Sequence, residues 1–187
     1  VVVWSSEVTR FGGLVRAAGI TGDGGHAEVS SKGVVDLSGK VDVTSAAGRA
    51  GSFLLDPRNI IIGVGGVGNP IENFDEFADA PTASVELNNN LIAAILASGA
   101  NVTLEASNDI TVSTTITVQS TTIGTLTLRA GRSIAVNFPI RFTTDGTSPA
   151  GHLVLEANAP GGVPGQRSSG LGGITISQTI VLTLGNV

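Results

Sequence analysis

The chain has 187 residues, a net charge of −5 and only ten lysines and arginines, which argues against a nucleic-acid backbone as its partner. It contains 26 glycines and no cysteine, so it is rich in turns and has neither a disulfide framework nor thiolate chemistry. Hydrophobic residues make up 41% but aromatic residues only 4%, and this predicts a narrow core of β-branched and aliphatic side chains.

Short apolar strands recur through the first third of the chain. Val3, Val29 and Leu55 end equivalent alternating pairs, each 26 residues after the one before. Alternation with a period of two places such residues on one face of a strand. A single short strand cannot bury that face unless the next turn stacks on it, so the pattern predicts a solenoid.

The period is interrupted between residues 63 and 101. This stretch holds the Gly-rich GVGGVGN, an acidic segment with Phe74 and Phe77, and then NNNLIAAILASG. The last piece predicts a helix over Asn90–Ala97, because asparagines before it offer N-cap oxygens and Gly99 follows as a stop signal. We expect its apolar stripe to pack on the outside of the rod. Its apolar run is far shorter than the ~20 residues that a membrane-spanning helix needs.

The second half repeats more clearly, in NVTLEASNDITV, TLTLRAGRSIAV and HLVLEAN. Val102, Leu126 and Leu153 open equivalent strands at spacings of 24 and 27 residues, and three short strands follow one another in each unit. A Gly- and Pro-rich stretch over 159–173 predicts a surface loop. Ten side chains are predicted to point inward: Val102, Leu104, Ile110, Val112, Leu126, Leu128, Ile134, Val136, Leu153 and Leu155.

These repeats predict an all-β fold, a right-handed parallel β-helix of about six turns with three short strands each. The whole chain, 1–187, is expected to form a single segment, with 63–101 as an extra-helical insertion that carries the short helix. A sandwich or an up-and-down barrel would prefer hairpin signals such as Asn-Gly between strands. Both ends begin or stop in strand-forming sequence without a polar cap, and exposed strand edges attract other strands. End-to-end or lateral self-association is therefore expected.

Four strings together resemble a known family: VVVWSSEVTRFGG, GGHAEVSSKG, GSFLLDPRNIII and ILASGANVTLEASNDITV. The chain resembles, over nearly its whole length, the filamentous haemagglutinin-like exoproteins of two-partner secretion systems. The resemblance implies export through an outer-membrane transporter and a long β-helical adhesive fibre at the surface of a Gram-negative bacterium. A host or neighbouring-cell glycan or surface receptor would be its partner. The missing cysteines fit passage of an unfolded chain, and the family's secretion module is not recognisable, which places the segment in the shaft.

The sequence thus predicts a structural, non-enzymatic segment with no catalytic, metal or cofactor site. Two alternatives stay open: a β-helical carbohydrate-active domain, whether lyase or glycan-binding module, and a short subunit that assembles end to end into an extracellular filament. A lyase needs clustered carboxylates beside a cation. Asp36, Lys40 and Asp42 could take those roles, but nothing comparable on the neighbouring turns completes a cleft.

Three aromatic residues, Trp4, Phe74 and Phe77, are candidate ligand contacts. His26 and His152 are about four turns apart, too far for one metal ion to bridge. Three charged residues on the outer face of the repeats, Glu105, Arg129 and Glu156, have a predicted structural role. They are expected to stack at the strand spacing as a ladder of opposite charges.

Overall fold

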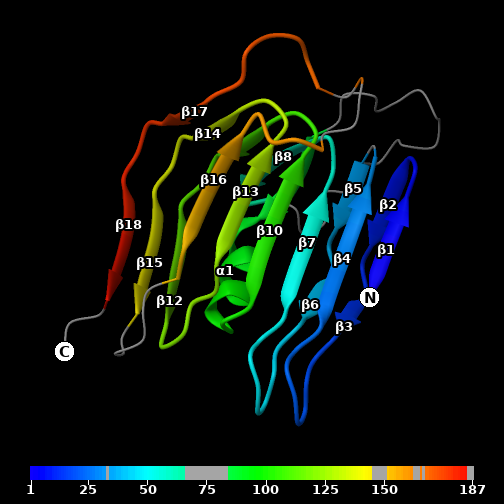
Figure 1. Ribbon diagram of the computed structural model, residues 1–187, viewed down its shortest axis with the longest axis vertical. Coiled ribbons are helices and arrows are strands. Elements are labelled where there is room, and N and C mark those ends of the chain that lie inside the picture. The colour runs from blue at the N-terminus through cyan, green and yellow to red at the C-terminus, as the bar shows by residue number, and fades with distance from the viewer. Residues whose placement is uncertain (33, 66–83, 145–150, 162–164, 166, 185–187) are drawn as a thin grey trace.

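The fold of this chain is a parallel β-solenoid. The computed structural model describes residues 1–187 except 33, 66–83, 145–150, 162–164, 166 and 185–187. Every strand pairing among the described residues is parallel, and each strand pairs with one from the preceding or following part of the repeat. In Figure 1 the strands of the sheet nearest the viewer lie side by side with their arrows pointing the same way. The predicted fold class is therefore confirmed.

The first face of the solenoid is one continuous sheet. Six strands stack in the order in which they occur along the chain, and they enclose about five turns where the sequence predicted about six. This sheet consists of β1 (Val2–Ser5), β4 (His26–Ser31), β7 (Ser52–Asp56), β10 (Asn101–Ala106), β13 (Leu126–Ala130) and β16 (Leu153–Ala157).

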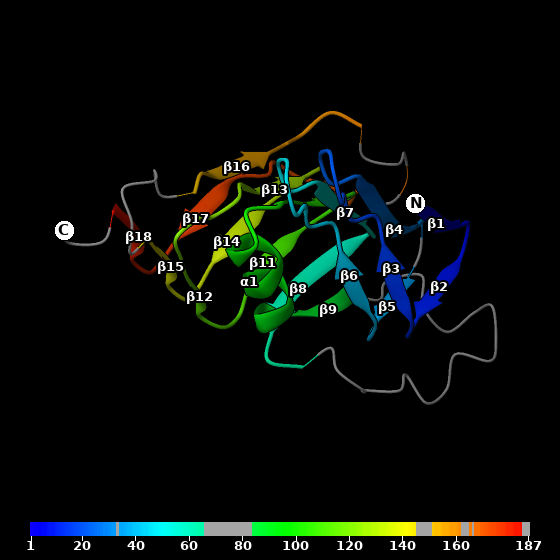
Figure 2. The same ribbon diagram turned by 90° about the horizontal axis from the view of Figure 1, so that it is seen from below.

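The second and third faces are each interrupted once. The second face holds the pair β2 (Val8–Phe11) and β5 (Val34–Leu37), and then β9 (Ser84–Asn88), β8 (Asn59–Gly63), β11 (Ile110–Val112), β14 (Ile134–Val136) and β17 (Ile174–Ile176). The third face holds the pair β3 (Leu14–Arg16) and β6 (Lys40–Asp42), and then β12 (Ile116–Ser120), β15 (Ile140–Thr144) and β18 (Ile180–Leu184). On the third face, the helix α1 (Asn89–Ala97) lies between β6 and β12, that is, between the two groups of strands of that face (Figure 2).

The interior is filled by the alternating apolar residues of all three faces. Eight of the ten side chains predicted to point inward are completely or almost completely buried, whereas Leu153 and Leu155 are partly buried and pack against the same core. The register stacks like on like, for example Ile60, Ile110 and Ile134 in successive strands of the second face. Stacked aliphatic side chains of equal length keep the strands in register because a shift by one residue would turn them outward.

The predicted helix is present, and its position differs from the prediction. The side chain of Asn88 accepts a hydrogen bond from the backbone N–H of Asn90 at the N-terminus, and Gly99, with φ +81°, follows the C-terminus. The buried residues Ile92 and Leu96 belong to the main core. The helix therefore takes the place of a third-face strand in the wall of the solenoid and does not pack on the outside. The physical reason is that the side chains of the main core cover its apolar stripe from within.

Two further features of the described residues bear on function. The strand β9, which directly precedes α1 inside the predicted insertion, pairs with β8 and so extends the second face. The helix α1 has nine residues, and no helix in the described part of the chain has the length and hydropathy to cross a lipid bilayer.

The two ends of the solenoid differ in how well the core is covered. In the C-terminal turn, Ile174 and Ile176 are 43% and 50% exposed, whereas Ile134 and Val136, their partners in the preceding turn, are buried. In the N-terminal turn, by contrast, the inward Val15 is only 3% exposed. Apolar side chains are exposed at both ends of the solenoid, and in the C-terminal turn they include Ile174, Ile176 and Leu182, whose partners one turn earlier are buried.

Candidate functional site

Charged side chains gather in one column on the outer face of the first sheet. Leu55 of β7 pairs with Leu104 of β10, so the residues that follow them, Asp56 and Glu105, lie side by side. The same row continues into the neighbouring strands β4, β13 and β16. We call the set the charged column, which consists from the N-terminal side of Ser30, Asp56, Glu105, Arg129 and Glu156.

In the column, Arg129 lies between two carboxylates. Its Nε atom is 2.9 Å from Oε2 of Glu156, and its Nη1 atom contacts Oε1 of Glu105. The hydrogen bond to Glu156 and then that to Glu105 raise the pKa of the guanidinium. The three side chains are 31 to 43% exposed, so each pair contributes only ~0.2–1 kcal/mol. The structure thus brings together all three residues of the predicted ladder.

Beside the ladder, the carboxylate of Asp56 has a perturbed pKa. Burial, followed by the negative charges of Glu105 and Glu28, raises this pKa to about 6. Arg129 is engaged with Glu105 and Glu156, and the hydroxyl of Ser30 donates to Glu28 at 2.7 Å. Within the column, Glu105 and Glu156 therefore have a cationic partner in Arg129, and the carboxylate of Asp56 has the least compensated charge.

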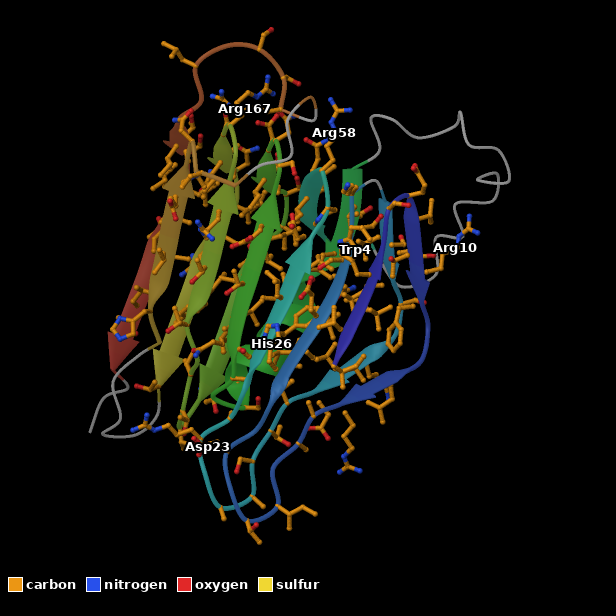
Figure 3. All side chains as sticks on the ribbon, turned by 45° about the vertical axis from the view of Figure 1, so that its right-hand side comes forward. Trp4, Arg10, Asp23, His26, Arg58 and Arg167 are labelled. Atoms are coloured by element: carbon orange, nitrogen blue, oxygen red, sulfur yellow. The ribbon has the colours of Figure 1, made fainter. Side chains whose placement is uncertain are left out.

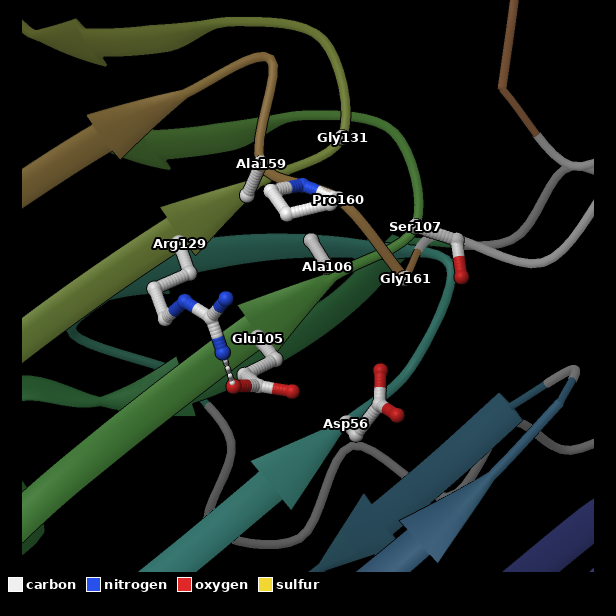
Figure 4. A pocket seen from close by; sticks show the side chains of 9 residues that line it. All are labelled: Asp56, Glu105, Ala106, Ser107, Arg129, Gly131, Ala159, Pro160 and Gly161. Atoms are coloured by element: carbon white, nitrogen blue, oxygen red, sulfur yellow. Dashed lines mark hydrogen bonds and ion pairs between the residues drawn. The ribbon is translucent and has the colours of Figure 1, made fainter.

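A small hollow opens beside Asp56. Figure 4 shows the Asp56 carboxylate at one side of it and the ion pair of Glu105 and Arg129 at another. Its volume of about 30 Å³ admits one or two water molecules, whereas ligand sites for small organic molecules occupy roughly 300–1,000 Å³. The hollow is therefore too small for a sugar ring. The far side is closed by the start of the loop after β16: Ala159, Pro160 and Gly161.

The aromatic candidates lie only partly within the described residues. Trp4 is 55% exposed on β1, opposite Ser30 of the charged column, and the Nζ atom of Lys32 lies 5.8 Å from the centre of its ring (Figure 3). Phe74 and Phe77 lie outside the described residues. The structure therefore places one exposed aromatic ring at the N-terminal edge of the first sheet.

The alternative catalytic residues do not converge. Asp36 lies on β5 of the second face, whereas Lys40 and Asp42 lie on β6 of the third face. The carboxylate of Asp42 accepts hydrogen bonds from Thr44 and forms an ion pair with Arg16 at 3.1 Å. The bonds from Thr44 lower its pKa first, and Arg16 lowers it further. Asp42 is thus held as a structural anion at a strand end.

The two histidines are also apart. His26 begins β4 and His152 directly precedes β16, and β16 is four strands further along the first sheet (Figure 1). The Nδ1 atom of His26 is 3.0 Å from the hydroxyl of Ser52, on the next strand. Within the described residues, no group of three or more His, Cys, Asp or Glu side chains is arranged to hold a metal ion.

Sequence reasoning missed the environment of Asp56, because it recognised only Glu105, Arg129 and Glu156 as members of the stacked charges. The alignment of FLLD with VTLE contained the signal, because it places Asp56 directly beside Glu105 in the stack. Its burial has no such signal, since part of the hollow is formed by residues that follow β16, about a hundred positions later.

The chain matches no known protein family, no curated protein and no solved structure. The solenoid is therefore established by its strand pairing alone.

Proposed function

We propose that this chain is a structural, non-catalytic segment of a secreted fibrous exoprotein of the filamentous haemagglutinin type, and that its fibre mediates adhesion at the surface of a Gram-negative cell. The parallel solenoid supports an elongated shape, since each turn adds one strand spacing of ~4.8 Å to a rod. The paired charges of the outer column support a stabilising role, and the hollow beside Asp56 has no room for a saccharide substrate.

The open C-terminal end is the observation that carries the proposal. Ile174, Ile176 and Leu182 are 41 to 50% exposed. Their partners in the preceding turn, Ile134, Val136 and Phe142, are buried. A further β-coil stacked in the same register would bury these side chains and pair the free edges of β16, β17 and β18. Such stacking is how a solenoid grows into a fibre.

The stacking step can be tested with one substitution and a matched control. Ile176→Lys places a charge on the open apolar end, and Thr175→Lys places the same charge on the outward face of the same strand. Sedimentation velocity over a concentration series should show self-association of the wild type and of Thr175→Lys, and less association of Ile176→Lys. A wild type that stays monomeric at high concentration would contradict stacking at this end.

Secretion and adhesion require a test on cells. An antibody raised against the purified chain should label intact cells of the source bacterium, and deletion of the partner outer-membrane transporter should abolish the labelling. Purified chain should also compete with those cells for attachment to host or neighbouring cells. Labelling only after permeabilisation would overturn the surface assignment.

A further inference from the structure

A cavity lies on the third face where the helix α1 replaces a strand. Its volume is about 310 Å³, within the range of small-molecule sites and ten times that of the hollow beside Asp56. It is separate from the charged column, which is on the first face. The cavity is lined by Lys40, Val41, Val43, Thr44, Leu91, Ala94, Ile95 and Ser98.

The cavity follows from how α1 is attached to the wall. A helix of ~10 Å diameter cannot continue the hydrogen-bond ladder of a sheet, so it must be held by side chains and by its ends. Three hydrogen bonds join α1 to the segment that follows β11: Asn89 to the carbonyl of Thr115, Ser120 to the carbonyl of Ala97, and Gly124 to the carbonyl of Leu96. The helix is thus drawn towards β12, and the cavity opens on its other side, beside β6.

The walls of the cavity are apolar and its polar groups are few. Val43 and Ile95 are buried at 1% and 5% exposure, and Val41 and Leu91 are partly buried beside them. Thr44 and Ser98 are exposed, and their hydroxyl groups already donate to the carboxylate of Asp42 and to the carbonyl of Ile95. An occupant must therefore present hydrocarbon to most of the wall and can place a polar group only where the cavity meets solvent.

The charge beside the cavity selects the polar group. Lys40 is exposed, and among the described residues it forms no ion pair. The neighbouring carboxylate of Asp42 is already engaged by Arg16 and Thr44. In a chain with a net charge of −5, this ammonium group is the feature that would attract an anion to the cavity.

We propose that the cavity between β6 and α1 binds an aliphatic carboxylate of medium length, a free fatty acid, with its alkyl chain against Val41, Leu91 and Ala94 and its carboxylate at the Nζ atom of Lys40. This inference is independent of the fibre proposal, because β12 and β15 lie between α1 and β18 on the third face (Figure 2).

Isothermal titration of the purified chain with hexanoate, octanoate and decanoate, below their micellar concentrations, tests the proposal. Each added methylene that becomes buried should tighten Kd about threefold to fourfold. Nonyltrimethylammonium, with the same nine-carbon tail and the opposite charge, should bind at least fivefold more weakly than decanoate. Affinity that is independent of chain length, or equal affinity for the cation, would overturn the proposal.

Two variants locate the site. Ala94→Phe fills the cavity from an exposed position of α1 and should abolish binding, whereas Ala135→Phe, on the outer face of β14, should leave it unchanged. Lys40→Gln should weaken decanoate binding twofold to fivefold, the effect expected of one exposed ion pair. Arg141→Gln, the same loss of charge elsewhere on the third face, should not.

A readout on the unchanged protein accompanies the variants. Methyl NMR spectra of the wild type should show decanoate shifting the signals of Leu91, Ile95, Val41 and Val43, while those of Ile134 stay in place. Shifts centred on the open end at Ile174 and Ile176 would assign the binding to that end instead and overturn the proposal.

Discussion

The substitution Asp56→Asn should stabilise the protein at neutral pH. The pKa of Asp56 is raised to about 6, mainly by burial and then by Glu105 and Glu28, against an ordinary value of 3.8. The ionised carboxylate is therefore less favourable in the folded chain than in the unfolded chain. Asparagine keeps the shape of the side chain and carries no charge, so it removes this unfavourable contribution.

The magnitude follows from the size of the shift. About two pKa units at ~1.4 kcal/mol each give an upper limit of ~3 kcal/mol. Because Asp56 is only partly buried, screening by solvent reduces the effect, and we expect a gain of about 1–2 kcal/mol at pH 7.5.

The dependence on pH has a definite sign. Below pH ~3.8 the carboxyl group is protonated in both states and the substitution has little effect. Between about 3.8 and 6 the folded state retains the proton that the unfolded state loses, so Asp56 makes the wild type progressively less stable as the pH rises. Above pH ~6 the difference between wild type and variant should be constant.

Urea unfolding followed by circular dichroism, at intervals from pH 4 to pH 8, measures this difference. Asp36→Asn removes an outward carboxylate from the second face and controls for the change in net charge. The reasoning is refuted if Asp56→Asn gives the same free energy of unfolding as the wild type at pH 7.5, or if its effect does not change between pH 4 and pH 7.5.

Three further substitutions have expected outcomes in urea unfolding. Arg129→Ala removes two partly exposed ion pairs, so it should lower the free energy of unfolding by about 1 kcal/mol, and by less at high salt. Surface adhesion should be unchanged, and loss of adhesion in a folded variant would contradict a purely structural ladder. Asn88→Ala should cost about 1 kcal/mol because the N-cap of α1 is lost, and no change would mean that helix packing alone holds this end. Gly124→Ala should cost roughly 3 kcal/mol or more, because its Cβ atom would lie 1.8 Å from the carbonyl oxygen of Ala100; Gly22→Ala, which meets no atom within 4 Å, is the control.

The strand pattern was predictable because it depends on local alternation. Val102, Leu126 and Leu153 open equivalent strands in the sequence, and the structure pairs them directly. The same spacing places Glu105 opposite Arg129. A repeat of near-constant length leaves one register in which all apolar side chains point inward, so the stacking of outward side chains follows from it.

The place of α1 was not predictable from its amphipathic pattern. Ile92 and Leu96 form an apolar stripe that could be covered equally well from outside the rod or from within it. Whether the helix packs inside or outside depends on the space between β6 and β12, two strands that are far apart in the sequence. The cavity beside Ile95 has the same origin, because a helix cannot complete the edge of a strand.

By itself, the sequence determined which residues face the interior and which stack outside, since a period of two within each strand and a repeat of about 25 residues leave one consistent arrangement. The tertiary structure alone decided which of the stacked charges is desolvated and where the wall is incomplete. Asp56 has its high pKa because neighbouring turns reduce its contact with water and, as a smaller effect, bring Glu105 and Glu28 beside it. Burial depends on segments that are distant in the chain and close in space, and no local pattern encodes it.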